Sequence, residues 1–105
     1  MTTKGVTIGA GAKDRSSEAE SARRALHVAI GKRIRAVRKN LGIGQAECAQ
    51  NAFIDTSSMF RIEKGQQNLT VETLARVALA LAVPIEDLLI GVVPDPTILE
   101  ARTRD

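Results

Sequence analysis

The chain has 105 residues, of which 44% are hydrophobic and 2% aromatic, and its formal net charge is +3 with an isoelectric point near 9.5. This length allows one small domain with flanking segments. The single cysteine excludes an internal disulfide and a cysteine-based metal site. Because the sequence shows neither a membrane-length apolar run nor a signal-peptide core, we expect a cytoplasmic, nucleoid-associated location and no membrane partner.

The charges are distributed unevenly along the chain. Residues 21–46 contain seven basic side chains and no acidic one, whereas residues 77–101 contain four acidic side chains and no basic one. This asymmetry predicts that one end of the domain faces phosphates and that the other faces solvent or a partner subunit. A solvated helix face is the alternative explanation of the basic run.

The amino-terminal residues 1–16 are rich in glycine, threonine and alanine and have no lasting periodicity, so they are expected to form a mobile arm. A helix is predicted to follow, because Ser17 and Glu20 have the spacing of a capping box, which places a start near Glu18. Apolar residues then recur every three or four positions up to Leu41. Two arrangements are compatible with this pattern: one helix over residues 18–40, or two helices that break near Gly31.

Residues 17–29 are interpreted as a helical extension of the domain. Ala19, Ala22 and Leu26 give it a narrow apolar strip that suits a partner helix. His27 lies beside this strip, and without a second histidine it is interpreted as a surface residue rather than a metal ligand. We expect neither a metal nor a cofactor.

Residues 45–65 are predicted to form two short helices joined by a tight corner, the first over residues 45–52 and the second over residues 56–64. Asp55 is expected to cap the second helix and Gly65 to end it. The inward stripe of the second helix contains Met59 and Ile62. Its outward face carries small hydroxyls and two cations that suit base edges and phosphates: Thr56, Ser57, Arg61 and Lys64.

A loop and two further helices are predicted to complete the domain. Thr70 has the position of a cap for a helix over residues 71–82, which Pro84 stops. Residues 85–90 are expected to form a short last helix, whose Leu88 and Leu89 cannot both face one small core. One of these leucines is expected to join a two-fold interface with the apolar residues that follow, so the predicted interface residues are Leu89, Ile90, Val92 and Val93.

The order and spacing of these motifs resemble the Cro/Xre-type helix-turn-helix regulators, which share the fold of lambdoid phage repressors. The resemblance covers about residues 30–89 and rests on IGKRIRAVRKNLG, Gln45, Ala49, the I-D-x-S start of the second short helix, RIEKG, NLTVETL and VPIEDLL. It implies an all-α, five-helix domain over residues 30–91 and a tail over residues 92–105 that is a possible dimer contact. The NLT segment is also similar to the controller proteins of restriction–modification systems.

The resemblance implies that a homodimer binds double-stranded DNA and regulates transcription from a palindromic operator, with two copies of the second short helix in major grooves about 34 Å apart. An ion pair between Arg38 and Glu63 is implied to fix that helix against the first. The residues implied to contact bases, with Arg61 as the first candidate for reading guanine, are Thr56, Ser57, Ser58, Phe60 and Arg61. Those implied to contact phosphates are Gln45, Lys64, Gln66, Gln67, Asn68 and Thr70.

Several positions leave alternatives open. Gln45 either bonds a phosphate and the side of the recognition helix or is a plain helix former, and the later glutamines either contact phosphate or belong to a solvated loop. Phe60 either touches a thymine methyl or a sugar, or folds back over the corner. Cys48 is either a small core residue or a redox sensor. The arm is either disordered or reaches a minor groove through its basic residues, Lys4, Lys13 and Arg15.

Phe53 departs from the pattern of the family, which favours glycine at this position. A left-handed backbone there costs a residue with a Cβ roughly 1 kcal/mol or more. A reshaped corner is therefore expected.

The opposing hypothesis is a protein-interaction module, such as an antitoxin or a transcriptional bridging factor, that binds a small protein partner through the arm, the extension or the tail after Gly91. An enzyme is not expected, because the sequence offers no paired acid and base, no nucleophile beside a histidine and no metal cluster.

Overall fold

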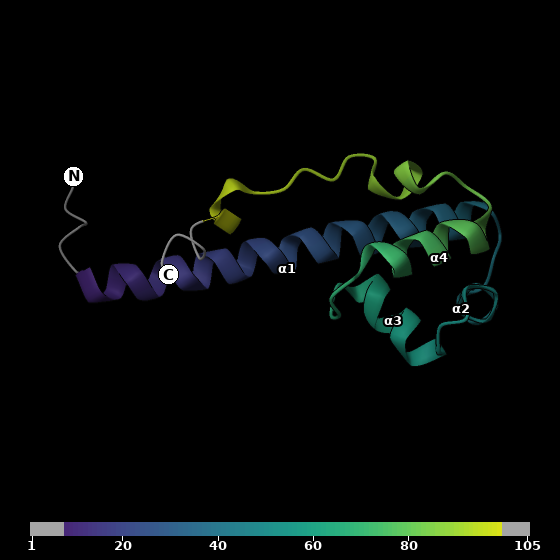
Figure 1. Ribbon diagram of the computed structural model, residues 1–105, viewed down its shortest axis with the longest axis horizontal. Helices are drawn as coiled ribbons and strands as arrows, with labels where there is room; N and C mark the ends of the chain where they lie inside the picture. Colours follow the sequence, from purple (N-terminus) through teal and green to yellow (C-terminus); the bar gives the residue numbers. More distant parts are fainter. Residues whose placement is uncertain (1–7, 100–105) are drawn as a thin grey trace.

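The computed structural model describes the backbone of residues 8–99 and the side chains of residues 17–99. All secondary structure in this part of the chain is helical, which confirms the predicted all-α class (Figure 1). The elements are α1 (Ile8–Asn40), α2 (Gln45–Ala52), α3 (Thr56–Lys64), α4 (Val71–Leu81) and two 3₁₀ helices, η2 (Ile85–Leu89) and η3 (Pro96–Leu99). The predicted fifth α-helix is not found, because the short stretch between Pro84 and the extended Ile90 forms only η2.

Helix α1 is continuous, so the arrangement with two helices is wrong. It begins at Ile8, which places Ser17 and Glu20 inside the helix and makes the predicted capping box wrong. Residues 8–16, expected in the arm, belong to α1, whereas residues 1–7 and the side chains of Lys13 and Arg15 lie outside the described residues. Gly31 is a packing site rather than a break. A Cβ there would lie 2.5 Å from the carbonyl oxygens of Ile62 and Glu63, so only glycine lets α3 approach α1 this closely.

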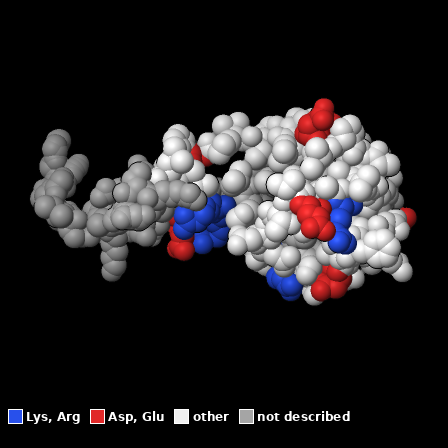
Figure 2. All heavy atoms as spheres, in the orientation of Figure 1, with Lys and Arg blue, Asp and Glu red and all other residues white. Residues whose placement is uncertain are grey.

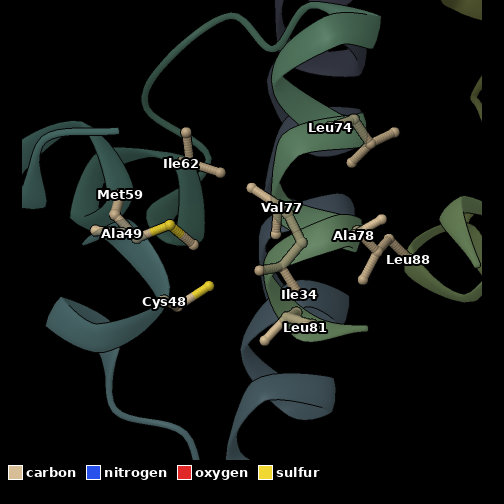
Figure 3. Close-up of a cluster of buried hydrophobic side chains, with 10 residues drawn as sticks. All are labelled: Ile34, Cys48, Ala49, Met59, Ile62, Leu74, Val77, Ala78, Leu81 and Leu88. Carbon is tan, nitrogen blue, oxygen red and sulfur yellow. The ribbon is translucent and has the colours of Figure 1, made fainter. Parts of the chain in front are cut away.

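The core lies between α1, α2, α3, α4 and η2. In Figure 3, side chains of α2 and α3 face Ile34 of α1 and those of α4, and Leu88 lies beyond α4. The buried cluster contains Ile34, Cys48, Ala49, Met59, Ile62, Leu74, Val77, Ala78, Leu81 and Leu88. Burial raises the pKa of the Cys48 thiol. These observations support the interpretation of Cys48 as a core residue, because a redox sensor needs an accessible thiolate.

The carboxyl-terminal segment returns along α1. Figure 1 shows it running from η2 back beside the long helix, and η3 packs against α1. Ala19 and Ala22, which were expected to face a partner helix, are buried within the chain itself. No helix in residues 8–99 has the length and apolar character that a bilayer crossing requires.

The corner between α2 and α3 has a residue in the left-handed conformation at position 53, the conformation for which the family favours glycine. The prediction that Phe53 reshapes the corner is therefore wrong. Phe53 has φ 57° and ψ 47°, and its N–H bonds to the last turn of α2. Its side chain is 86% exposed. The strain of about 1 to 2 kcal/mol expected at such a position is therefore not offset by burial of the ring.

Candidate nucleic-acid interface

The start of α3 is fixed by local hydrogen bonds. The carboxylate of Asp55 accepts the Ser58 N–H at 2.7 Å and the Ser57 hydroxyl at 3.2 Å. These bonds, chiefly those from Ser58, lower the pKa of Asp55 below its ordinary value. The negative charge also complements the positive end of the helix dipole. The cap therefore fixes the residue at which α3 begins and orders its first turn.

The end of α3 is fixed by close contact with α1. Gly65 ends the helix with φ 73°, and its amide bonds to the carbonyl of Ile62. A Cβ on Gly65 would lie 2.5 Å from the Cα of Val28. The left-handed backbone and the lack of space both require glycine here.

A buried ion pair joins α1 to α3. Arg38 Nε lies 2.6 Å from Glu63 Oε2 and Arg38 Nη2 lies 2.9 Å from Oε1, while Nη1 donates to the Ile43 carbonyl at 2.9 Å. The side chains are 9% and 3% exposed, and the bond to Glu63 raises the pKa of Arg38. Gln45 Nε2 donates to Glu63 Oε1 at 3.0 Å, so the start of α2 is tied to the same carboxylate. The arginine fork thus holds α3 against α1, and the bond from Gln45 holds it against the start of α2.

The outward face of α3 presents polar and basic side chains to solvent. Thr56, Ser57, Arg61 and Lys64 are exposed and Ser58 is half-buried, whereas Met59 and Ile62 face the core. Arg61 Nε donates to Gln67 Oε1 at 3.0 Å and Nη2 to the Ser58 hydroxyl at 3.2 Å. The guanidinium is therefore held on the surface of α3 by two neighbouring residues that are themselves candidate contacts.

Phe60 forms one wall of a groove of about 520 Å³ between α1 and α3. Its ring is partly exposed, and Lys64 Nζ lies 5.5 Å from the ring centroid. Phe60 therefore does not fold back over the corner. The other residues that line the groove are Val28, Lys32, Arg35, Arg38, Gln45, Glu63 and Lys64.

The loop after α3 forms a second hollow, of about 380 Å³, with the middle of α1. From the loop it is lined by residues 65–68, which include the candidates Gln66, Gln67 and Asn68. From α1 it is lined by Glu20, Arg23, Arg24 and His27, and the side chain of His27, interpreted from the sequence as a surface residue, is half-buried. Thr70 lies beyond the hollow, where its hydroxyl caps α4 by accepting the Thr73 N–H at 3.0 Å.

Four basic residues at this surface are not among the predicted contact residues: Arg23, Arg24, Lys32 and Arg35. The run of basic residues over residues 21–46 was expected to face phosphates. That run alone does not say which side chains face α3. Within the described residues, no group of three or more histidine, cysteine, aspartate or glutamate side chains could hold a metal ion.

A family model described as a helix-turn-helix domain matches residues 31–93. The chain belongs to this helix-turn-helix family. The clp gene regulator ClgR from Corynebacterium glutamicum has a similar structure, with a TM-score of 0.62 and 28% identity over 76% of this chain and 84% of that chain. The restriction-modification controller protein C.AhdI from Aeromonas hydrophila has a TM-score of 0.57 and 30% identity over 58% of this chain and 92% of that chain.

A third structure, the hypothetical transcription factor NHTF from Neisseria, shares the fold with a TM-score of 0.59 and 23% identity over 78% of this chain and 89% of that chain. Among curated proteins, no sequence match was found. The matches confirm that the protein is a Cro/Xre-type helix-turn-helix regulator of transcription and that its family binds DNA.

The end of the helix-turn-helix domain exposes apolar side chains. Leu88 is buried in the core, which leaves Leu89 on the outside. Ile90 is 57% exposed and Val93 is 84% exposed, while Val92 is half-buried. These four candidate interface residues thus lie close together on one short segment, from the last residue of η2 to Val93.

Proposed function

We propose that this protein binds a specific double-stranded DNA operator as a homodimer and regulates transcription from it. One observation carries the proposal: α3 exposes hydroxyls and cations on its outward face, while the buried Arg38–Glu63 pair holds its other side against α1. A rigidly held helix with such a face suits docking in a major groove. The family membership of the chain supports the same partner.

Arg61 is proposed to read a guanine through two parallel hydrogen bonds to its major-groove edge. The hydrogen bonds from Arg61 to Gln67 and Ser58 support this role, because they orient the guanidinium before DNA arrives. Thr56, Ser57, Ser58 and Phe60 are proposed to contact neighbouring bases, and the ring of Phe60 suits a thymine methyl or a sugar.

The backbone of the operator is proposed to bind on both sides of α3. Gln45 stands at the start of α2, where free helix amides add to its own amide group. Its bond to Glu63 keeps it at the edge of the groove beside α3. The other proposed phosphate contacts are Lys64, Gln66, Gln67, Asn68 and Thr70; the hydroxyl of Thr70 already caps α4, so its contact is assigned to the backbone amide.

Two-fold symmetry is proposed from the exposed apolar segment, Leu89, Ile90, Val92 and Val93. A dimer through this segment buries side chains that otherwise face water. The two α3 helices are then expected about 34 Å apart, one turn of DNA. The interaction-module hypothesis gains no support from the extension, because the apolar strip at Ala19 and Ala22 is already covered by the chain itself.

The test begins with selection of bound sequences from a random duplex pool. Arg61→Ala is expected to weaken binding to the selected site by about 1 to 3 kcal/mol and to relax preference at one base per half-site. Arg61→Lys is the matched control, because it keeps the charge and loses the fork. If Arg61→Ala weakens binding equally on the selected site and on a random duplex, Arg61 contacts only phosphate. If the wild-type chain selects no sequence at all, the proposed function is wrong.

A further inference from the structure

Four basic side chains of α1 lie beside the end of α3. Arg23 and Arg24 line the hollow with the loop after α3, and Lys32 and Arg35 line the groove with Phe60 and Lys64. The contacts of Gly31 with α3 and of Gly65 with Val28 place the two hollows on either side of the same helix end. We call Arg23, Arg24, Lys32 and Arg35 the α1 basic row.

The positive charge of this row is largely uncompensated within the described residues. Glu20 lies 4.0 Å from Arg23, but both side chains are substantially exposed, so this pair is weak. Glu63 also lines the groove, but it is buried and engaged by Arg38. Figure 2 shows basic side chains gathered where α1 leaves the rounded part of the molecule. A polyanion brought to the outward face of α3 therefore meets a second set of cations.

We propose that the α1 basic row is a second phosphate-binding surface, which holds the duplex backbone outside the base pairs contacted by α3; the proposal rests on the proposed function. From Arg23 to Arg35 the row spans about 18 Å of helix axis. One strand of a duplex presents about five phosphates over that length. Because Arg23 and Lys32 lie nine residues apart, on opposite sides of α1, the four side chains face a backbone from the two hollows that flank the end of α3 rather than along one line.

The surroundings of the row favour nucleic-acid backbone over an acidic protein segment. The amide side chains of Gln66, Gln67 and Asn68 face Arg23 and Arg24 across the hollow, and they add donors that suit phosphate oxygens. On the other side the row continues into Lys64 of α3 itself. A ligand that docks on α3 and extends in either direction meets further basic side chains, with amide groups beside them in the hollow on the Arg23 side.

The decisive variant is Arg23→Gln combined with Arg24→Gln in the full chain, with a duplex selected by the wild-type chain and a random-sequence duplex of equal length as probes. Log affinity falls with log salt, and each lost phosphate contact reduces the magnitude of this slope by about 0.9, so the slope of the double variant is expected to be shallower by about 2 units. The same relation predicts roughly 30-fold weaker binding near 0.15 M salt on both probes. Base preference is expected to stay unchanged.

Two controls separate contact from net charge and from misfolding. Arg23→Lys with Arg24→Lys keeps both charges and is expected to bind like the wild type. Arg35→Gln is compared with Arg33→Gln, which removes the same charge from the same helix but from a side chain that donates to the Asp87 carbonyl at 2.6 Å, away from α3. Only Arg35→Gln is expected to make the slope of log affinity against log salt shallower, by about one unit.

Removing base pairs that flank the selected half-sites is expected to weaken the wild-type chain and to leave the Arg23→Gln, Arg24→Gln variant unaffected. The proposal is overturned if the double variant, folded as judged by circular dichroism, keeps the wild-type slope and flank dependence. That result differs from failure of the proposed function, in which the wild-type chain shows no sequence preference and no salt-dependent binding.

Discussion

The two ends of α3 are held by different kinds of interaction. At its carboxyl end, glycine contacts and a buried ion pair join α3 to α1, and little of this is exposed to water. At its amino end, the helix depends on a strained residue, Phe53, and on the exposed cap Asp55. The comparison indicates that contacts at the carboxyl end set the angle between α3 and α1. The residues at the amino end fix only the backbone of the corner and of the first turn, which lie close to the proposed base contacts.

The largest expected effect is at the carboxyl end. Glu63→Ala leaves Arg38 buried without its carboxylate and is expected to lower the free energy of unfolding by about 3 to 5 kcal/mol. Arg38→Ala is expected to do the same, and the double variant to cost less than the sum. Urea unfolding of all four proteins measures the coupling. A coupling near zero would show that the Arg38–Glu63 pair does not hold the carboxyl end of α3 against α1.

A smaller effect, of opposite sign, is expected at the corner. Phe53→Gly removes a Cβ from a left-handed position, a relief of about 1 to 2 kcal/mol, and makes the unfolded chain more flexible, which costs about 0.4 to 1 kcal/mol. The net result is a stabilisation of about 0 to 1.6 kcal/mol, measured by thermal unfolding. Phe53→Ala is the control, because it keeps the Cβ and removes the ring. If Phe53→Ala gives the same gain as Phe53→Gly, the cost comes from the ring and not from the backbone.

The smallest effect is expected at Asp55 and depends on pH. Hydrogen bonds from Ser58 and Ser57 lower the pKa of Asp55 in the folded chain, so the unfolded chain binds more protons between the two pKa values. The cap therefore stabilises the fold above the unfolded pKa, about 3.9, and this contribution is lost as the pH falls further. Asp55→Asn also caps but does not titrate. The Tm of the wild type is expected to fall relative to that of Asp55→Asn below about pH 4, and parallel Tm curves would contradict the assignment.

Local signals predicted the central elements well. The predicted spans of α2 and α3 agree with the structure, and α4 ends one residue before its predicted end at Ala82. Asp55 and Thr70 accept the amide hydrogen bonds that their cap positions require, and Gly65 is left-handed as expected. These features depend on residues within one helical turn, so the order of side chains suffices to find them.

Features that depend on distant residues were not predictable in the same way. The packing of η3 on α1 and the burial of the Arg38–Glu63 pair require the tertiary arrangement. The start of α1 was missed because Ser17 and Glu20 match a cap pattern that is also compatible with a helix interior. The two hollows beside α3 arise only when α1 and the loop after α3 are brought together, so the basic run over residues 21–46 did not show which of its side chains lie beside α3.

The sole sulfhydryl of the protein, Cys48, lies fully enclosed in the core, and its burial disfavours ionisation. A water-soluble alkylating reagent therefore meets this sulfur only in molecules whose helices have separated. The rate of its modification reports, without any introduced label, how often the centre of the domain opens.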